Sequence, residues 1–135
     1  MAPLAHTAQL CLLVPRLLRL LGEQPACWRH VARLLDVGHE TMVSIMVDLT
    51  RQNGRSRVAG TLLRMAGCRF EDPRPGDQTE IRVPQSEIAA LSVMSRNTLG
   101  TYLAELARMG LIEIRYRSLR ILDARGLRAL LDSEE

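Results

Sequence analysis

The side chains best suited to recognition chemistry stand at the start of one predicted helix, over residues 96–108. An arginine there can form a bidentate pair with guanine O6 and N7, and an asparagine with adenine N6 and N7. Backbone amides at a helix start also bind phosphate. The candidate residues for contact with double-stranded DNA are the polar and small residues of this segment: Ser95, Arg96, Asn97, Thr98, Gly100 and Thr101.

The same segment carries the apolar stripe that packing of this helix requires. Ser95 suits the N-cap position, where its hydroxyl accepts from the amide of Asn97 or Thr98. Gly110 suits the left-handed position after the last turn. Positions i, i+3, i+4 and i+7 are apolar, as expected for a buried face: Leu99, Tyr102, Leu103 and Leu106.

A shorter helix is predicted between Pro84 and the turn that precedes Ser95. Ile88 and Leu91 form its apolar pair, and Ala89 is small enough for a second helix to cross closely. Two short helices joined by a tight turn form a helix-turn-helix, which places its second helix in the DNA major groove. A solvated helical hairpin has the same stripe, so the flanking elements decide the interpretation.

Short strands are predicted on both sides of these helices. Residues 81–83 alternate before them, and residues 111–114 and 119–122 follow them as a hairpin. The turn of the hairpin carries Arg115 and Arg117, which suit phosphate contacts that fix register without reading bases. Strand, helix, turn, helix and hairpin together indicate a winged helix-turn-helix.

Residues 25–52 predict the longest helix, and it carries a heptad pattern. A parallel two-stranded coiled coil with a second copy is the natural partner for such a stripe. One helix of a monomeric bundle is the alternative. The seam residues, stepping alternately by three and four, are Trp28, Val31, Leu35, Gly38, Met42, Ile45 and Leu49.

The remaining segments complete the expected organisation. Residues 10–14 predict a strand, and 15–21 a short helix that begins at Pro15. After a break at residues 53–54, a helix is predicted over 55–67, and a last helix over 124–131. We therefore expect an N-terminal remnant (1–24), a dimerisation helix (25–52) and a winged helix-turn-helix domain (53–135). The fold class is mainly α with a small β component (α+β).

Composition excludes several function classes. Aromatic residues make up 3% of the 135 residues, which argues against stacking platforms for single strands. All 18 basic residues are arginine, and the net charge of +3 permits polyanion binding. Scattered cysteines and histidines predict no metal or other cofactor and a cytoplasmic location. No catalytic constellation stands out, since Asp48 and Glu105 are interpreted as ordinary helix-surface residues, so we expect no enzyme. No segment predicts a membrane span.

The order of these motifs resembles the Crp/Fnr family of bacterial transcription regulators, over roughly residues 10–131. The resemblance implies a homodimer that binds double-stranded DNA and, in activators, contacts RNA polymerase. It is carried by residues 57–59 and 62–63 in the helix after the break, 87–89 in the first motif helix, 95–99 opening the second, 106 with 110–112, and 121–123.

Four departures from the family pattern concern the predicted site. The family's N-terminal cyclic-nucleotide-type barrel has no counterpart beyond the strand at 10–14. Val93 stands where the motif turn usually has glycine, and Pro84 replaces the usual Ser/Thr cap. Asn97 and Thr101 replace a common Glu and Arg, so the family's commonest half-site is not expected.

The sequence thus predicts a sequence-specific transcription regulator that binds a palindromic operator as a homodimer. Two alternatives stay open. One is a truncated interaction protein that pairs with full-length relatives and inhibits them. The other is a degenerate fragment or a gene read from the wrong start.

Overall fold

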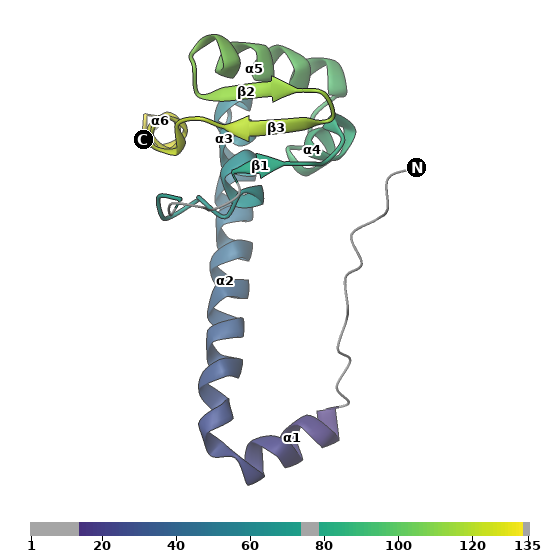
Figure 1. Cartoon of the computed structure of the whole chain (residues 1–135), viewed down its shortest axis with the longest axis vertical. Coiled ribbons are helices and arrows are strands. Elements are labelled where there is room, and N and C mark those ends of the chain that lie inside the picture. The colour runs from purple at the N-terminus through teal and green to yellow at the C-terminus, as the bar shows by residue number, and fades with distance from the viewer. Residues whose placement is uncertain (1–13, 74–78, 134–135) are drawn as a thin grey trace. The chain divides into compact units, whose positions relative to one another are not determined.

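The computed structural model describes residues 14–73 and 79–133 (Figure 1). As predicted, the fold is mainly helical with a small sheet. The chain divides into two compact units, Met1–His39 and Glu40–Glu135, so that α2 passes from one to the other. The elements are α1 (Val14–Glu23), a 3₁₀ turn η1 (Pro25–Cys27), α2 (Trp28–Thr50), α3 (Gly54–Met65), β1 (Glu80–Ile81), α4 (Gln85–Leu91), α5 (Arg96–Arg108), β2 (Ile112–Arg115), β3 (Ser118–Ile121) and α6 (Ala124–Asp132).

The first unit differs from expectation at both ends of its short helix. Val14, predicted to end a strand, lies in α1, and residues 10–13 of that predicted strand lie outside the described residues. α1 also continues past Leu21 to Glu23. Pro25 opens η1 rather than the long helix, because the amide of Trp28 donates to the Pro25 carbonyl in the tighter i to i+3 pattern.

The predicted seam of α2 is exposed along most of its length. Leu35 is 69% exposed and Met42 66%, and of the seam's large apolar residues only Val31 is half-buried. The helix instead buries Ser44 and Asp48, one turn apart, within the second unit. Much of the seam is therefore left uncovered within the described part of the chain, with Ile45 and Leu49 less exposed at 36% and 37%.

Asp48 is a buried ionic centre, so its interpretation as an ordinary surface residue is wrong. It is 1% exposed and bonds to Arg64 and, at 2.9 Å, to Arg69. A Cβ on Gly60 would clash with the Asp48 carboxylate, so glycine permits the close crossing of α2 and α3. These contacts fix the end of α2 against α3 and the segment that follows α3.

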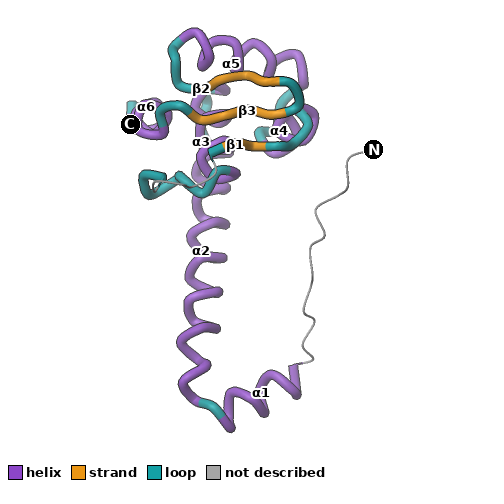
Figure 2. The backbone as a smooth tube through the Cα atoms, in the orientation of Figure 1, coloured by secondary structure: helices purple, strands orange, loops and turns teal. Residues whose placement is uncertain are grey.

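In the second unit the sheet has the order β1-β3-β2, with both pairs antiparallel (Figure 2). Its inner face and the helices α3, α4, α5 and α6 share one core. The large core residues are Val58, Leu62, Leu63, Ile81, Ile88, Leu99, Leu103, Leu106, Leu111, Ile112, Leu119, Ile121, Leu127 and Leu131. Burying this apolar surface is the main source of the unit's stability.

Leu91 was predicted to pack inward, but it is 48% exposed. The buried positions of α4 are Ile88 and Ala89, and Ser92 follows one turn after Ile88. Because α4 has only seven residues, these positions complete its inward face and Leu91 turns to solvent. The predicted pair of apolar residues was therefore wrong at its second member.

Three helices of the second unit end in the same motif. The amide two residues beyond the last turn bonds back across five residues, as in Cys68 to Leu63, Met94 to Ala89 and Leu111 to Leu106. The residue before that amide is left-handed in each: Gly67 at φ 68°, Val93 at 52° and Gly110 at 74°. Val93 therefore adopts the left-handed conformation at the position where the Crp/Fnr family usually has glycine. A β-branched residue is strained in this conformation.

Candidate nucleic-acid interface

The start of α5 presents its polar residues in two groups. Ser95 caps the helix by accepting from the Thr98 amide at 3.1 Å, and the two hydroxyls share a hydrogen bond of 2.8 Å. Both hydroxyls are therefore engaged in holding the helix start. The exposed side chains of Arg96 and Asn97 have no hydrogen bond or ion pair with any described residue, which leaves their full bonding capacity for a ligand.

The next turn of α5 is open to close approach. A Cβ at Gly100 would meet nothing within 4 Å, so the backbone there is accessible. Thr101 is exposed and donates its hydroxyl to the Asn97 carbonyl at 3.3 Å, and its side chain also carries a methyl group. A methyl group of this kind suits apolar contact with thymine.

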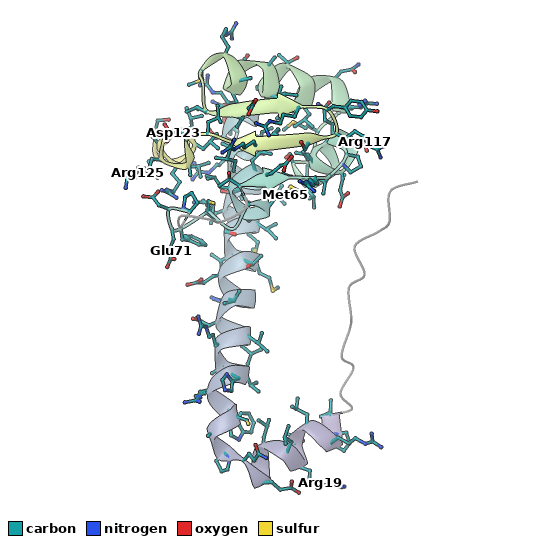
Figure 3. All side chains as sticks on the ribbon, in the orientation of Figure 1. Arg19, Met65, Glu71, Arg117, Asp123 and Arg125 are labelled. Atoms are coloured by element: carbon teal, nitrogen blue, oxygen red, sulfur yellow. The ribbon has the colours of Figure 1, made fainter. Side chains whose placement is uncertain are left out.

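A groove of about 450 Å³ lies between the hairpin and the loop that leads into α4. Arg96 reaches it from α5, Arg115 and Arg117 from the hairpin, and Arg82 from the segment after β1. Arg117 lies at the end of the hairpin (Figure 3). Three predicted site residues are thus brought together, and Arg82 joins them. The alternation of apolar and polar residues over 81–83 could have identified Arg82. Neighbouring residues of a strand face opposite sides, so Arg82 faces away from the side on which Ile81 is buried.

Two of these four arginines already hold a carboxylate. Arg115 bonds to Glu113 at 2.8 Å, and this hydrogen bond raises the pKa of Arg115. Arg82 bonds to Glu80 at 2.9 Å. A hydrogen bond from Ser118 and then that from Arg82 lower the pKa of Glu80, so Glu80 stays ionised at neutral pH. Arg96 and Arg117 have no such partner among the described residues.

Arg115 occupies a different position from the one predicted. The register pairs Arg115 with Ser118, so the hairpin turn consists of Tyr116 and Arg117 alone. Arg115 is the last residue of β2 rather than part of the turn. Arg117 is at φ 60° and stands at the tip, where a side chain can reach a phosphate beside the groove.

The start of α3 also contacts α5. A Cβ on Gly54 would lie 2.5 Å from the Tyr102 ring, so glycine lets α3 begin directly against α5. Asn53 caps α3 by accepting from the Arg55 amide at 2.9 Å, a role that its residue type favours. The apolar stripe of α5 alone did not identify Gly54 as a residue in contact with this helix.

Residues 56–130 match the Crp-like helix-turn-helix domain family, which is more than half of the chain. The chain belongs to this family. The match agrees with the winged helix-turn-helix that α4, α5 and the β2–β3 hairpin form. No curated protein sequence matches the chain.

Solved structures of Crp/Fnr regulators resemble the chain over most of its length. A CRP-family transcriptional regulator from Thermus thermophilus is 28% identical, with a TM-score of 0.60 over 80% of this chain and 55% of that one. A CRP/FNR-family regulator from the same organism is 24% identical, with a TM-score of 0.61 over 83% and 57%. A CooA variant from Carboxydothermus hydrogenoformans is 20% identical, with a TM-score of 0.67 over 87% and 55%. The last two show the shared fold, and the chain spans little more than half of each structure.

Among the described residues, no helix has the length and apolar character needed to cross a lipid bilayer.

Proposed function

We propose that this protein is a DNA-binding transcription regulator that binds a palindromic operator as a homodimer, in which α2 pairs with α2 of a second copy. The observation that carries the proposal is the exposed heptad seam of α2, which leads directly into the DNA-binding unit. Apolar area in water costs about 25 cal/mol per Å², and a contiguous exposed stripe marks an interaction surface. A second, identical stripe is the self-complementary partner that two-fold symmetry provides.

In this proposal residues 25–52 form the dimerisation helix and residues 84–122 read DNA, with 1–24 as a remnant ahead of them. Arg96, Asn97, Gly100 and Thr101 face base edges, while Ser95 and Thr98 hold the start of α5 and offer backbone amides to a phosphate. Arg82, Arg115 and Arg117 contact phosphates along the groove. The groove geometry supports this division, because its arginines flank the start of α5.

Selection of duplexes from a random pool, followed by sedimentation of the protein with the recovered duplex, tests the proposal. We expect an inverted repeat bound by two copies of the chain, with half-sites about 34 Å apart because a dimer axis places two recognition helices in successive major grooves. Recovery of no preferred sequence would contradict sequence-specific reading. A monomer that binds one half-site would contradict the role of α2 while leaving DNA reading intact.

A further inference from the structure

A chain of polar side chains crosses the interior of the second unit, from α2 through α3 to the motif turn. Its members, here called the buried polar chain, are Asp48, Arg64, Thr61 and Ser92. Asp48 is 1% exposed, Thr61 2% and Ser92 0%. Polar groups at such depth are costly unless they are bonded, so each link of the chain has an energetic consequence.

The geometry fixes the direction of the hydrogen bonds. The Thr61 hydroxyl donates to the Arg57 carbonyl at 2.9 Å. Its oxygen then accepts from Arg64 Nη2 at 3.2 Å and from the Ser92 hydroxyl at 3.1 Å. Every bonding position of Thr61 is thereby filled. Arg64 is held in turn by Asp48, so Ser92 is connected to α2 without a break.

Ser92 is the residue next to the strained one. It is the C-cap of α4, and Val93 follows it in the left-handed conformation at φ 52°. The two equivalent helix ends in this unit use glycine, which adopts that conformation without strain. The turn at Val93 therefore needs an external tether that the glycine turns do not need, and the exposed Val93 side chain supplies little packing.

We propose that Ser92 and Thr61 are positioning residues for DNA reading, anchored through Arg64 by Asp48. The buried polar chain holds the turn in its left-handed conformation and so fixes the point at which α5 begins. Ser95, Arg96 and Asn97 follow within five residues of Ser92, so a relaxed turn would displace the cap and the base-reading side chains together. The inference rests on the proposed sequence-specific function.

The test compares Ser92→Ala and Thr61→Val with wild type on two duplexes, the selected operator and a scrambled sequence of equal composition. Ser92→Ala removes one hydrogen bond, whose net loss corresponds to about two- to tenfold in affinity, and Thr61→Val removes three and should lose at least as much. We expect that loss for the operator, with the scrambled duplex affected less than about twofold because phosphate contacts tolerate displacement. Thr61→Ser keeps the hydroxyl and should retain wild-type discrimination.

Rescue separates positioning from simple stability. In a Val93→Gly background the turn is unstrained, so adding Ser92→Ala should leave operator affinity within about twofold of Val93→Gly alone. Amide hydrogen exchange on the free protein gives a reading without DNA. Ser92→Ala should speed exchange at Val93, Met94, Thr98 and Leu99, and Val93→Gly should reverse it.

Two outcomes would overturn the proposal. The first is a Ser92→Ala variant with a lower melting temperature but an unchanged ratio of operator to scrambled affinity. The second is an equal loss of operator affinity when Ser92→Ala is made in the wild-type and in the Val93→Gly backgrounds. A wild-type protein with no preferred sequence would contradict the proposed function instead, and the exchange experiment would still decide whether the buried polar chain positions the turn.

Discussion

Arg117 and Arg115 stand two residues apart on the hairpin and differ in what they already contact. Arg115 is bonded to Glu113, while Arg117 at the tip has no ion pair among the described residues. A paired arginine must leave its carboxylate before it can bind phosphate. The two residues therefore form a matched pair for measuring how much a pre-existing ion pair reduces DNA contact.

We predict that Arg117→Ala weakens binding to the operator and to the scrambled duplex about equally. It should also lower the slope of log affinity against log salt concentration by about 0.9. Fluorescence anisotropy across a salt series measures both quantities. Arg115→Ala is the control and should lower the slope by less, because Glu113 already neutralises that charge. Equal slope changes in the two variants would contradict the role given to the ion pair.

Arg96→Ala should instead reduce the difference in affinity between the operator and other sequences. Its guanidinium is exposed at the first turn of α5 and is available to bond a guanine edge. Loss of one bidentate base contact costs about 1–3 kcal/mol of discrimination. Competition between the operator and single-base variants measures it. Uniform weakening on every duplex would show that Arg96 binds phosphate rather than a base.

Asp72 ties the segment after α3 to α6. It accepts from Arg125 Nε at 2.7 Å and is also paired with Arg128, on the side of the unit where Figure 3 labels Arg125. Hydrogen bonds from Arg125 and then Arg128 hold the pKa of Asp72 below its usual 3.8. A lowered pKa means that the carboxylate stabilises the folded state above its unfolded pKa, and that this stabilisation is lost as pH falls through the folded pKa.

We therefore predict that Asp72→Asn is less stable than wild type at neutral pH and that the difference shrinks on acidification. Urea midpoints measured over a pH series check the prediction. Glu71→Gln is the neighbouring control: Glu71 contributes its backbone carbonyl to Arg128, and the substitution leaves that carbonyl in place. A difference that grows as pH falls would contradict the sign derived from the Asp72 pKa.

At the scale of an element, three helices share one C-terminal motif, so the stability of glycine and of valine can be compared in the same left-handed conformation. Val93→Gly should raise stability by about 1 kcal/mol, because strain of about 1–3 kcal/mol is relieved and a largely exposed side chain is lost. That corresponds to a rise of about 4–8 °C in melting temperature for a unit of this size. Differential scanning calorimetry measures the rise.

Gly67→Val is the reciprocal control. Gly67 has φ 68° and open space around its Cβ position, so only backbone strain distinguishes the variant from wild type. It should lower the melting temperature by a similar amount. If Val93→Gly were destabilising while Gly67→Val was also destabilising, the Val93 side chain would be making contacts that outweigh its strain.

At the scale of the whole molecule, the state of assembly depends on the seam of α2. Met42→Glu places a charge on the seam and should convert the proposed dimer to a monomer, because a buried unpaired carboxylate costs several kcal/mol. Val43→Glu is the matched control: it adds the same charge one residue away, off the seam, at a position that is 43% exposed. Analytical ultracentrifugation at micromolar concentration distinguishes the two variants. Equal effects would place the dimer contact elsewhere.

Most elements could be predicted from the sequence, and both ends of α5 were predicted correctly. Apolar spacing identified α5 and its buried stripe, Ser95 marked the cap of this helix, and the order of elements identified the winged motif. These features depend on residues within one or two turns of each other, so local pattern suffices. The resembling family usually has glycine at the position of Val93, which indicated a strained turn, and Val93 does have a positive φ of 52°.

The buried charge and the grouping of arginines around one groove depend on packing between elements that are far apart in the sequence. Asp48 belongs to the polar side of a heptad helix, yet it is buried by Arg64 and Arg69, which lie 16 and 21 residues away. Ser92 meets Thr61 across 31 residues, and Arg82 joins Arg117 only because β1 pairs with β3. Contacts of this kind arise from packing between elements, and a pattern read along one element carries no information about them.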